Sequence, residues 1–131
     1  MSGQVWSLIV LGLLTLTACG GSSGGGSSTT GPSVPAPAGL TISITSAGVA
    51  PKSLMVSAGS QVTFTNGDVV LHEMYSDPHP DHTDCPEINQ VGFLNPGQSR
   101  TSGNLNVVRS CGFHDHDQPT NAALQGTVVI Q

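Results

Sequence analysis

The stretch LTISIT at residues 40–45 alternates apolar with polar side chains, the pattern of a strand with one buried face. Residues 51–66 follow with PKSLMVSAGSQVTFTN, in which two apolar runs flank a short Ala-Gly-Ser turn. No segment shows a sustained helical period, so the chain is predicted to be all-β. The candidate strands are 40–45, 54–56, 61–65, 69–75, 91–94, 98–101, 105–110 and 127–130. Seven or eight short strands separated by turns predict a Greek-key β-sandwich.

Length and charge limit the kinds of function. A chain of 131 residues holds at most one modest domain, which excludes a large multidomain enzyme. Three basic residues stand against eight acidic ones, giving a net charge of −5. This balance leaves no electrostatic basis for binding phosphate backbones, so nucleic acid is not an expected partner.

The N-terminal residues are typical of an exported, lipid-anchored protein. An apolar run at residues 5–16 is too short to cross a bilayer but suits a secretory signal. It ends in Leu-Thr-Ala-Cys at 16–19, which resembles a bacterial lipobox. We therefore expect a signal peptide at 1–18, a lipid on Cys19, a flexible Gly/Ser/Pro linker over 19–39, and a folded domain over 40–131. The protein would lie outside the cytoplasm, anchored to the membrane by lipid alone and facing the periplasm or the cell surface.

The five histidines form two groups, each where a candidate strand runs into a loop. Imidazole is the commonest transition-metal ligand, and copper is the divalent metal that nitrogen sites hold most tightly. Grouped histidines in an exported protein therefore predict copper first and zinc second, with one ion per chain. The first group is His72, His79 and His82, and the second is His114 and His116.

The spacing of these residues resembles the plastocyanin-like cupredoxins. Residues 51–66 followed by His72 resemble the opening of those proteins, and Ser-Cys-Gly-Phe-His at 110–114 resembles their closing half. The resemblance implies a cupredoxin-like sandwich whose copper is held by His72, Cys111 and His114. Its axial ligand would be Gln118 or, further away, Met74. Such a site changes little between Cu(I) and Cu(II), so the resemblance implies electron transfer with a redox partner in the cell envelope.

The cysteines leave a second interpretation open. With Cys19 lipidated, Cys85 and Cys111 form an even pair in an oxidising compartment, where such pairs are often disulfides. The sequence also resembles a cupredoxin-like group ending in Tyr/Phe-His-Asp-His. Copper would then be held by imidazoles in a nearly colourless site, and the function would be copper carriage or buffering. The ligands of that site would be His72, His114 and His116, with His79 or His82.

An enzyme is the weakest alternative. Residues 112–116, Gly-Phe-His-Asp-His, resemble a ligand stretch of the copper-zinc superoxide dismutases. In that family further histidine ligands follow this stretch, whereas no histidine follows His116 here. We therefore expect a copper-binding protein that is not an enzyme, with electron transfer as its first function.

Overall fold

The computed structural model describes residues 40–131. The predicted signal peptide, the lipidated Cys19 and the linker lie outside these residues. Within the described part, no helix is long and apolar enough to cross a membrane.

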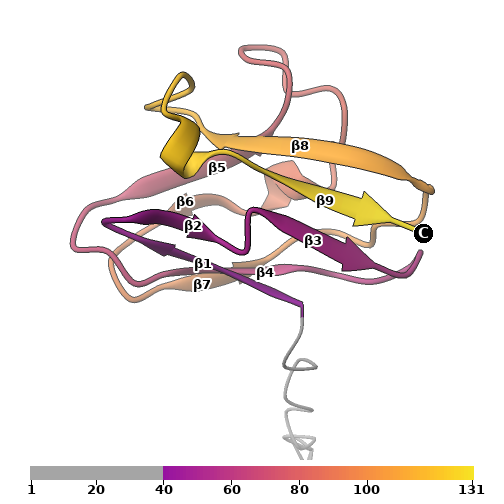
Figure 1. Cartoon of the computed structure of the whole chain (residues 1–131), viewed down its shortest axis with the longest axis horizontal. Helices are drawn as coiled ribbons and strands as arrows, with labels where there is room; N and C mark the ends of the chain where they lie inside the picture. Colours follow the sequence, from indigo (N-terminus) through magenta and orange to yellow (C-terminus); the bar gives the residue numbers. More distant parts are fainter. Residues whose placement is uncertain (1–39) are drawn as a thin grey trace, which may run out of the picture. The chain divides into compact units, whose positions relative to one another are not determined.

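Nine strands and two short 3-10 helices make up the described domain, and the strands form two mixed sheets (Figure 1). The four-stranded sheet has the order β2-β1-β4-β7 and the five-stranded sheet the order β3-β9-β8-β5-β6. The first sheet comprises β1 (Thr41–Thr45), β2 (Gly48–Ala50), β4 (Thr63–Asn66) and β7 (Ser99–Thr101). The second comprises β3 (Ser53–Val56), β5 (His72–Ser76), β6 (Gly92–Leu94), β8 (Arg109–Asp115) and β9 (Gly126–Ile130). The 3-10 helices are η1 (Ile88–Gln90) and η2 (Ala122–Leu124). The all-β sandwich expected from the sequence is confirmed.

The core lies between the two sheets. Phe64 of β4 and Phe113 of β8 meet edge to face, with ring centroids 5.2 Å apart. Both rings are fully buried, and apolar residues of the other strands surround them. Because side chains alternate along a strand, the position of Phe113 identifies the face of β8 that points into the sandwich.

Strand boundaries differ from the sequence prediction mainly at β8. The predicted strand at residues 105–110 is wrong in its bounds: Leu105 makes only an isolated bridge to Ser60, and β8 runs from Arg109 to Asp115. The apolar Val107 and Val108, which suggested the earlier start, are exposed. Residues 109–115 are extended because they pair with both β9 and β5, a tertiary effect that local composition does not reveal.

Two further strands also differ from the prediction. Strand β2 was not predicted, because three residues give too short an apolar pattern to recognise. Strand β5 begins at His72, whereas the prediction began it at Val69. Residues 69–71 instead form an exposed bend that precedes the first histidine.

Candidate metal centre

The pairing of β5 with β8 divides their side chains between two faces of the five-stranded sheet. Tyr75 pairs with His114, and Met74 pairs with Asp115. Asp115 has the same parity as Phe113 and therefore points into the sandwich, whereas His114 points outward. His72 and Met74 share the inner face, and Tyr75 shares the outer one.

Four of the five histidines gather on the outer face. One ring nitrogen from each of His79, His82, His114 and His116 lies within 4.8 Å of the others. Their exposure is graded: His114 is buried, His82 and His116 are half-buried, and His79 is exposed. The loop after β5 supplies His79 and His82, while β8 and the residue after it supply His114 and His116. We call this set the four-histidine cluster.

His114 is held by a carboxylate and has a free nitrogen. Its Nδ1 donates to Asp77 Oδ1 over 2.6 Å, so in the neutral ring Nε2 carries the lone pair. That Nε2 is buried and has no hydrogen-bond partner within the described residues. Gly112 makes room for this carboxylate, since a Cβ at residue 112 would collide with Asp77. An oriented, unpaired imidazole nitrogen of this kind is what a metal ligand requires.

His82 is oriented by the backbone. Its Nδ1 donates to the carbonyl oxygen of Ser76 over 2.8 Å, which leaves Nε2 as an acceptor. His116 Nδ1 lies 3.0 Å from that Nε2 and is therefore its donor in the metal-free protein. Asn89 also donates to the carbonyl oxygen of His82, which fixes the loop at this residue. A metal ion would replace the hydrogen bond between the two imidazoles.

His79 and Tyr75 complete the surroundings of the cluster. The pKa of His79 is lowered from its usual 6.5 by desolvation of its ring and by the neighbouring imidazoles, with His116 first among them. The Tyr75 ring lies 4.7 Å from that of His82 and 5.5 Å from that of His116, measured between centroids. A hydrogen bond with Glu73, followed by desolvation, raises the pKa of the Tyr75 phenol. Because the pKa of His79 is lowered, this ring stays neutral, and so able to bind a metal, at a lower pH than an ordinary histidine does.

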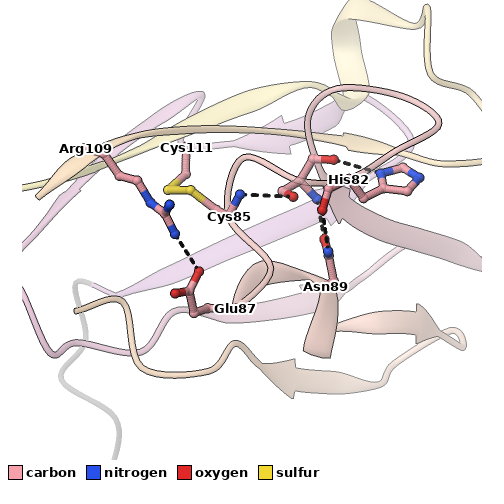
Figure 2. The surroundings of a disulfide bond; sticks show 7 residues. His82, Cys85, Glu87, Asn89, Arg109 and Cys111 are labelled. Atoms are coloured by element: carbon pink, nitrogen blue, oxygen red, sulfur yellow. Dashed lines mark hydrogen bonds and ion pairs between the residues drawn. A yellow bond between two sulfur atoms is a disulfide. The ribbon is translucent and has the colours of Figure 1, made fainter. Parts of the chain in front are cut away.

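Cys111 is not free to bind a metal. It forms a disulfide with Cys85, with 5.7 Å between the two Cα atoms, and both residues are fully buried (Figure 2). Cys111 also has the parity of Phe113, so it points to the opposite face from His114. The expected trigonal site of His72, Cys111 and His114 is therefore wrong for this structure, and the alternative pairing of Cys85 with Cys111 is the one observed.

The disulfide joins the loop of the cluster to β8. Cys85 lies three residues after His82, and Figure 2 shows both on the same loop beside β8. Nearby, Arg109 donates to Glu87 Oε2 over 2.8 Å. The crosslink and the ion pair together hold residues 82–87 against the strand that carries His114.

The remaining candidate ligands lie away from the cluster. His72 points inward and its Nδ1 donates to Asp115 Oδ2 over 2.6 Å. Met74 is fully buried in the core. Gln118 is exposed, and its Oε1 accepts from Asn121. The structure thus brings together His79, His82, His114 and His116, and it separates His72, Met74 and Gln118 from them.

Two residues that orient the cluster were missed from the sequence. Asp77 holds His114 and the Ser76 carbonyl holds His82, and neither role was predicted from the sequence. An aspartate two residues before His79 in a histidine-rich loop is a weak signal, because loop acids are usually solvated. The register of β5 against β8 is what makes Asp77 a neighbour of His114.

Comparison with solved structures agrees with the architecture. A purple cupredoxin from Nitrosopumilus maritimus superposes with a TM-score of 0.55 at 19% identity, covering 70% of this chain and 99% of that one. Oxidised plastocyanin from the fern Dryopteris crassirhizoma gives 0.54 at 19% identity, with the same coverage. Amicyanin from Paracoccus versutus gives 0.55 at 17% identity, covering 72% of this chain and 84% of that one. This chain has a cupredoxin fold.

Sequence comparison adds nothing to that assignment. No protein-family model matches the chain, and no curated protein matches it either. At these identities the cupredoxin likeness concerns the fold, so the chemistry of the site has to be argued from this chain's own residues.

Proposed function

We propose that the four-histidine cluster binds one copper ion and that the protein carries or buffers copper outside the cytoplasm. The observation that carries the proposal is the buried Nε2 of His114, which has no hydrogen-bond partner among residues 40–131. His114 belongs to a cluster in which one ring nitrogen from each of four histidines lies within 4.8 Å of the others. Leaving such an atom without a partner costs about 1–3 kcal/mol, which a bound metal ion would recover.

The donor set favours copper over other metals. Four neutral imidazoles suit Cu(II), which has the highest affinity of the divalent first-row metals for nitrogen sites. The anchoring of His114 by Asp77 and of His82 by Ser76 matches the outer hydrogen bonds that orient metal-bound histidines. The cupredoxin fold supports the same metal, since an amicyanin variant of this fold has been solved with Cu(I).

Carriage fits the site better than electron transfer because both cysteines of residues 40–131 are paired in the disulfide and offer no thiolate. With Cys111 in a disulfide, the site consists of imidazoles, and one of them, His79, is exposed to solvent. An exposed ligand can be exchanged for a ligand of a partner protein, which gives copper a route in and out. The proposed role is one of binding, and we assign the cluster no catalytic step.

Electron transfer is the second candidate, with a redox partner in the cell envelope. It is favoured by the fold, because a fern plastocyanin in both oxidised and reduced states is among the similar structures. Bound copper would supply the redox change, and anchored ligands would limit reorganisation. Voltammetry of the copper-loaded protein tests this candidate. Reversible one-electron cycling, with the number of copper ions per chain unchanged, would favour it over carriage.

The disulfide and the N-terminal sequence both support a location outside the cytoplasm. A buried disulfide suits an oxidising compartment, in keeping with export. We propose that Cys19 carries the lipid anchor. The wild type should partition into detergent, because dual acylation gives stable attachment. A Cys19→Ser variant cannot carry the lipid and should stay in the aqueous phase. Identical partitioning of the two proteins would contradict the anchor.

Titration of the purified full chain with Cu(II) tests the copper site. We expect one tightly bound ion, electron paramagnetic resonance showing nitrogen ligands, and only weak visible absorption, because no thiolate contributes charge transfer. His116→Ala should weaken copper binding more than about 100-fold, since loss of an outer hydrogen bond alone costs about 10- to 100-fold. If the tightest copper affinity of His116→Ala equals that of the wild type, the proposal is refuted.

Gln118→Ala is the matched control. Gln118 lies on the same loop two residues beyond His116 but outside the cluster, so its removal should leave copper affinity unchanged. An intense blue band in the copper-loaded protein would also refute the all-imidazole site.

A further inference from the structure

A second histidine environment lies on the inner face of the sheet, beside a cavity of about 110 Å³. The cavity is lined by His72, Asp68 and polar residues of the β1–β2 turn and of the loop after β8, together with the apolar Val70, Ala123 and Leu124. His72 is 2% exposed and the Asp68 side chain 11% exposed. This group belongs to neither the four-histidine cluster nor the function proposed for it.

The His72 ring is fixed by a carboxylate that is itself fixed. Its Nδ1 donates to Asp115 Oδ2 over 2.6 Å, a short charge-assisted bond. The other oxygen of Asp115 accepts from the backbone N–H groups of Glu73 and Asp117, at 3.3 and 3.1 Å. A carboxylate that holds one imidazole nitrogen leaves the second oriented as a metal ligand.

The second nitrogen faces another carboxylate at a distance that suits a bound ion. His72 Nε2 lies 3.4 Å from Asp68 Oδ2, which is long for a charge-assisted hydrogen bond. Because Nδ1 donates to Asp115, Nε2 of the neutral ring carries a lone pair, as does the carboxylate oxygen. A proton on Nε2 would make this contact a hydrogen bond, and a metal ion in place of that proton would bind both lone pairs. Ligands about 2.1 Å from a tetrahedral metal ion lie about 3.4 Å apart.

Asp68 is held in place for this role. Its Oδ1 accepts from the backbone N–H of Val69 over 2.6 Å, and its own N–H donates to Asn66 Oδ1 over 2.8 Å. Gln118 and Asn121, which also line the cavity, are hydrogen-bonded to each other. Water molecules of about 30 Å³ each would fit beside an ion in the cavity and complete its coordination.

We propose that His72 Nε2 and Asp68 Oδ2 bind a divalent metal ion, zinc, in this cavity, separately from the copper site on the outer face. One imidazole, one carboxylate and water are ordinary zinc ligands. Asp115 is the positioning residue that orients His72. Each site therefore combines a strand residue with loop residues: His72 begins β5, and Asp68 lies in the bend between β4 and β5.

Zinc titration of the full chain, followed by elemental analysis after dialysis, tests the second site. Free Zn(II) should bind at two equivalents in the wild type, since imidazoles of the outer cluster also take zinc. His116→Ala should reduce this to one equivalent, and Asp68→Asn should also reduce it to one. The matched control is Asp117→Asn, which makes the same charge change at an exposed nearby acid and should keep two.

Asp68→Asn is expected to remain folded, because the new amide can donate to His72 Nε2; circular dichroism on heating checks this. Equal zinc binding by Asp68→Asn and the wild type would overturn the proposal. It would mean that a proton, and not a metal ion, lies between His72 Nε2 and Asp68 Oδ2. Failure of the outer site would appear differently, as one zinc in the wild type, one in His116→Ala and none in Asp68→Asn.

Discussion

The two faces of β5 and β8 carry histidines in contrasting surroundings. On the outer face, His79, His82, His114 and His116 face one another, and a loop supplies two of them. On the inner face, His72 stands alone between the carboxylates of Asp115 and Asp68. His114 and Asp115 are consecutive residues, yet each belongs to a different site because side chains alternate along a strand.

This contrast shows how neighbours determine the chemistry of a histidine. Four imidazoles make a nitrogen-rich set that suits copper, whereas an imidazole beside a carboxylate makes a mixed nitrogen and oxygen set of the kind that zinc takes. A shift of one residue in the pairing of β8 would exchange the two faces. The Cys85–Cys111 disulfide secures only the outer site, because it ties down the loop that carries two of its ligands.

Removal of the disulfide should have the largest effect and should fall mainly on the outer face. In Cys85→Ala/Cys111→Ala, a crosslink across 26 residues is lost. The free energy of unfolding should fall by about 3 kcal/mol, as expected for a loop of this size. Urea unfolding measures this loss, and a copper titration should show weaker binding. Unchanged copper affinity in the folded variant would mean that the loop holds its histidines without the crosslink.

The carboxylate behind His114 should have the next largest effect. Asp77→Asn replaces the acceptor that orients this ring, so copper affinity should fall about 10- to 100-fold. Competition with a chelator of known affinity measures the change. Asp81→Asn, an exposed acid on the same loop, is the control and should match the wild type. A loss of zinc from the inner site in Asp77→Asn would show that the two faces are coupled.

A titration of the metal-free protein sharpens the description of the outer face. Because desolvation and the neighbouring imidazoles lower the pKa of His79, its ring should titrate below 6.5 by nuclear magnetic resonance. Its neutral form therefore persists as the pH falls through 6.5, and protons compete for this ligand only at lower pH. In His116→Ala the titration of His79 should move back toward 6.5. A midpoint above 6.5 in the wild type would contradict the close packing of the four rings.

The smallest effect is expected beside the disulfide. Glu87→Gln removes a partly exposed ion pair with Arg109, and the free energy of unfolding should fall by about 0.2–1 kcal/mol. Copper and zinc stoichiometry should not change, since neither residue lies in either site. A change in metal content would show that this ion pair, and not the crosslink alone, positions the loop.

Much of the architecture was predictable from local pattern. The alternation at residues 40–45 predicted β1 almost to its bounds, and the apolar runs before and after residues 58–60 predicted β3 and β4. These strands have one buried face, so their period of two is visible in the sequence. The two histidine groups were also visible locally, because their members lie close together in the sequence, within residues 72–82 and 114–116.

The bounds of β8 and the choice of ligands depended on tertiary structure. Residues 111–115 become a strand through pairing with β5 and β9, and that register places His114 outside and Asp115 inside. The resemblance to plastocyanin-like proteins assigned His72 and Cys111 to copper. The disulfide and the inward orientation of His72 remove both from the outer cluster.

By itself, the sequence determined that the chain would be a β-sandwich with histidines gathered at the ends of its strands, because alternation, turns and residue type are local properties. It left open which histidines meet and whether Cys111 is free. The tertiary structure decided both, because ligand sets form across strands far apart in the chain. Their side chains share a face only when the register of β5 against β8 is set.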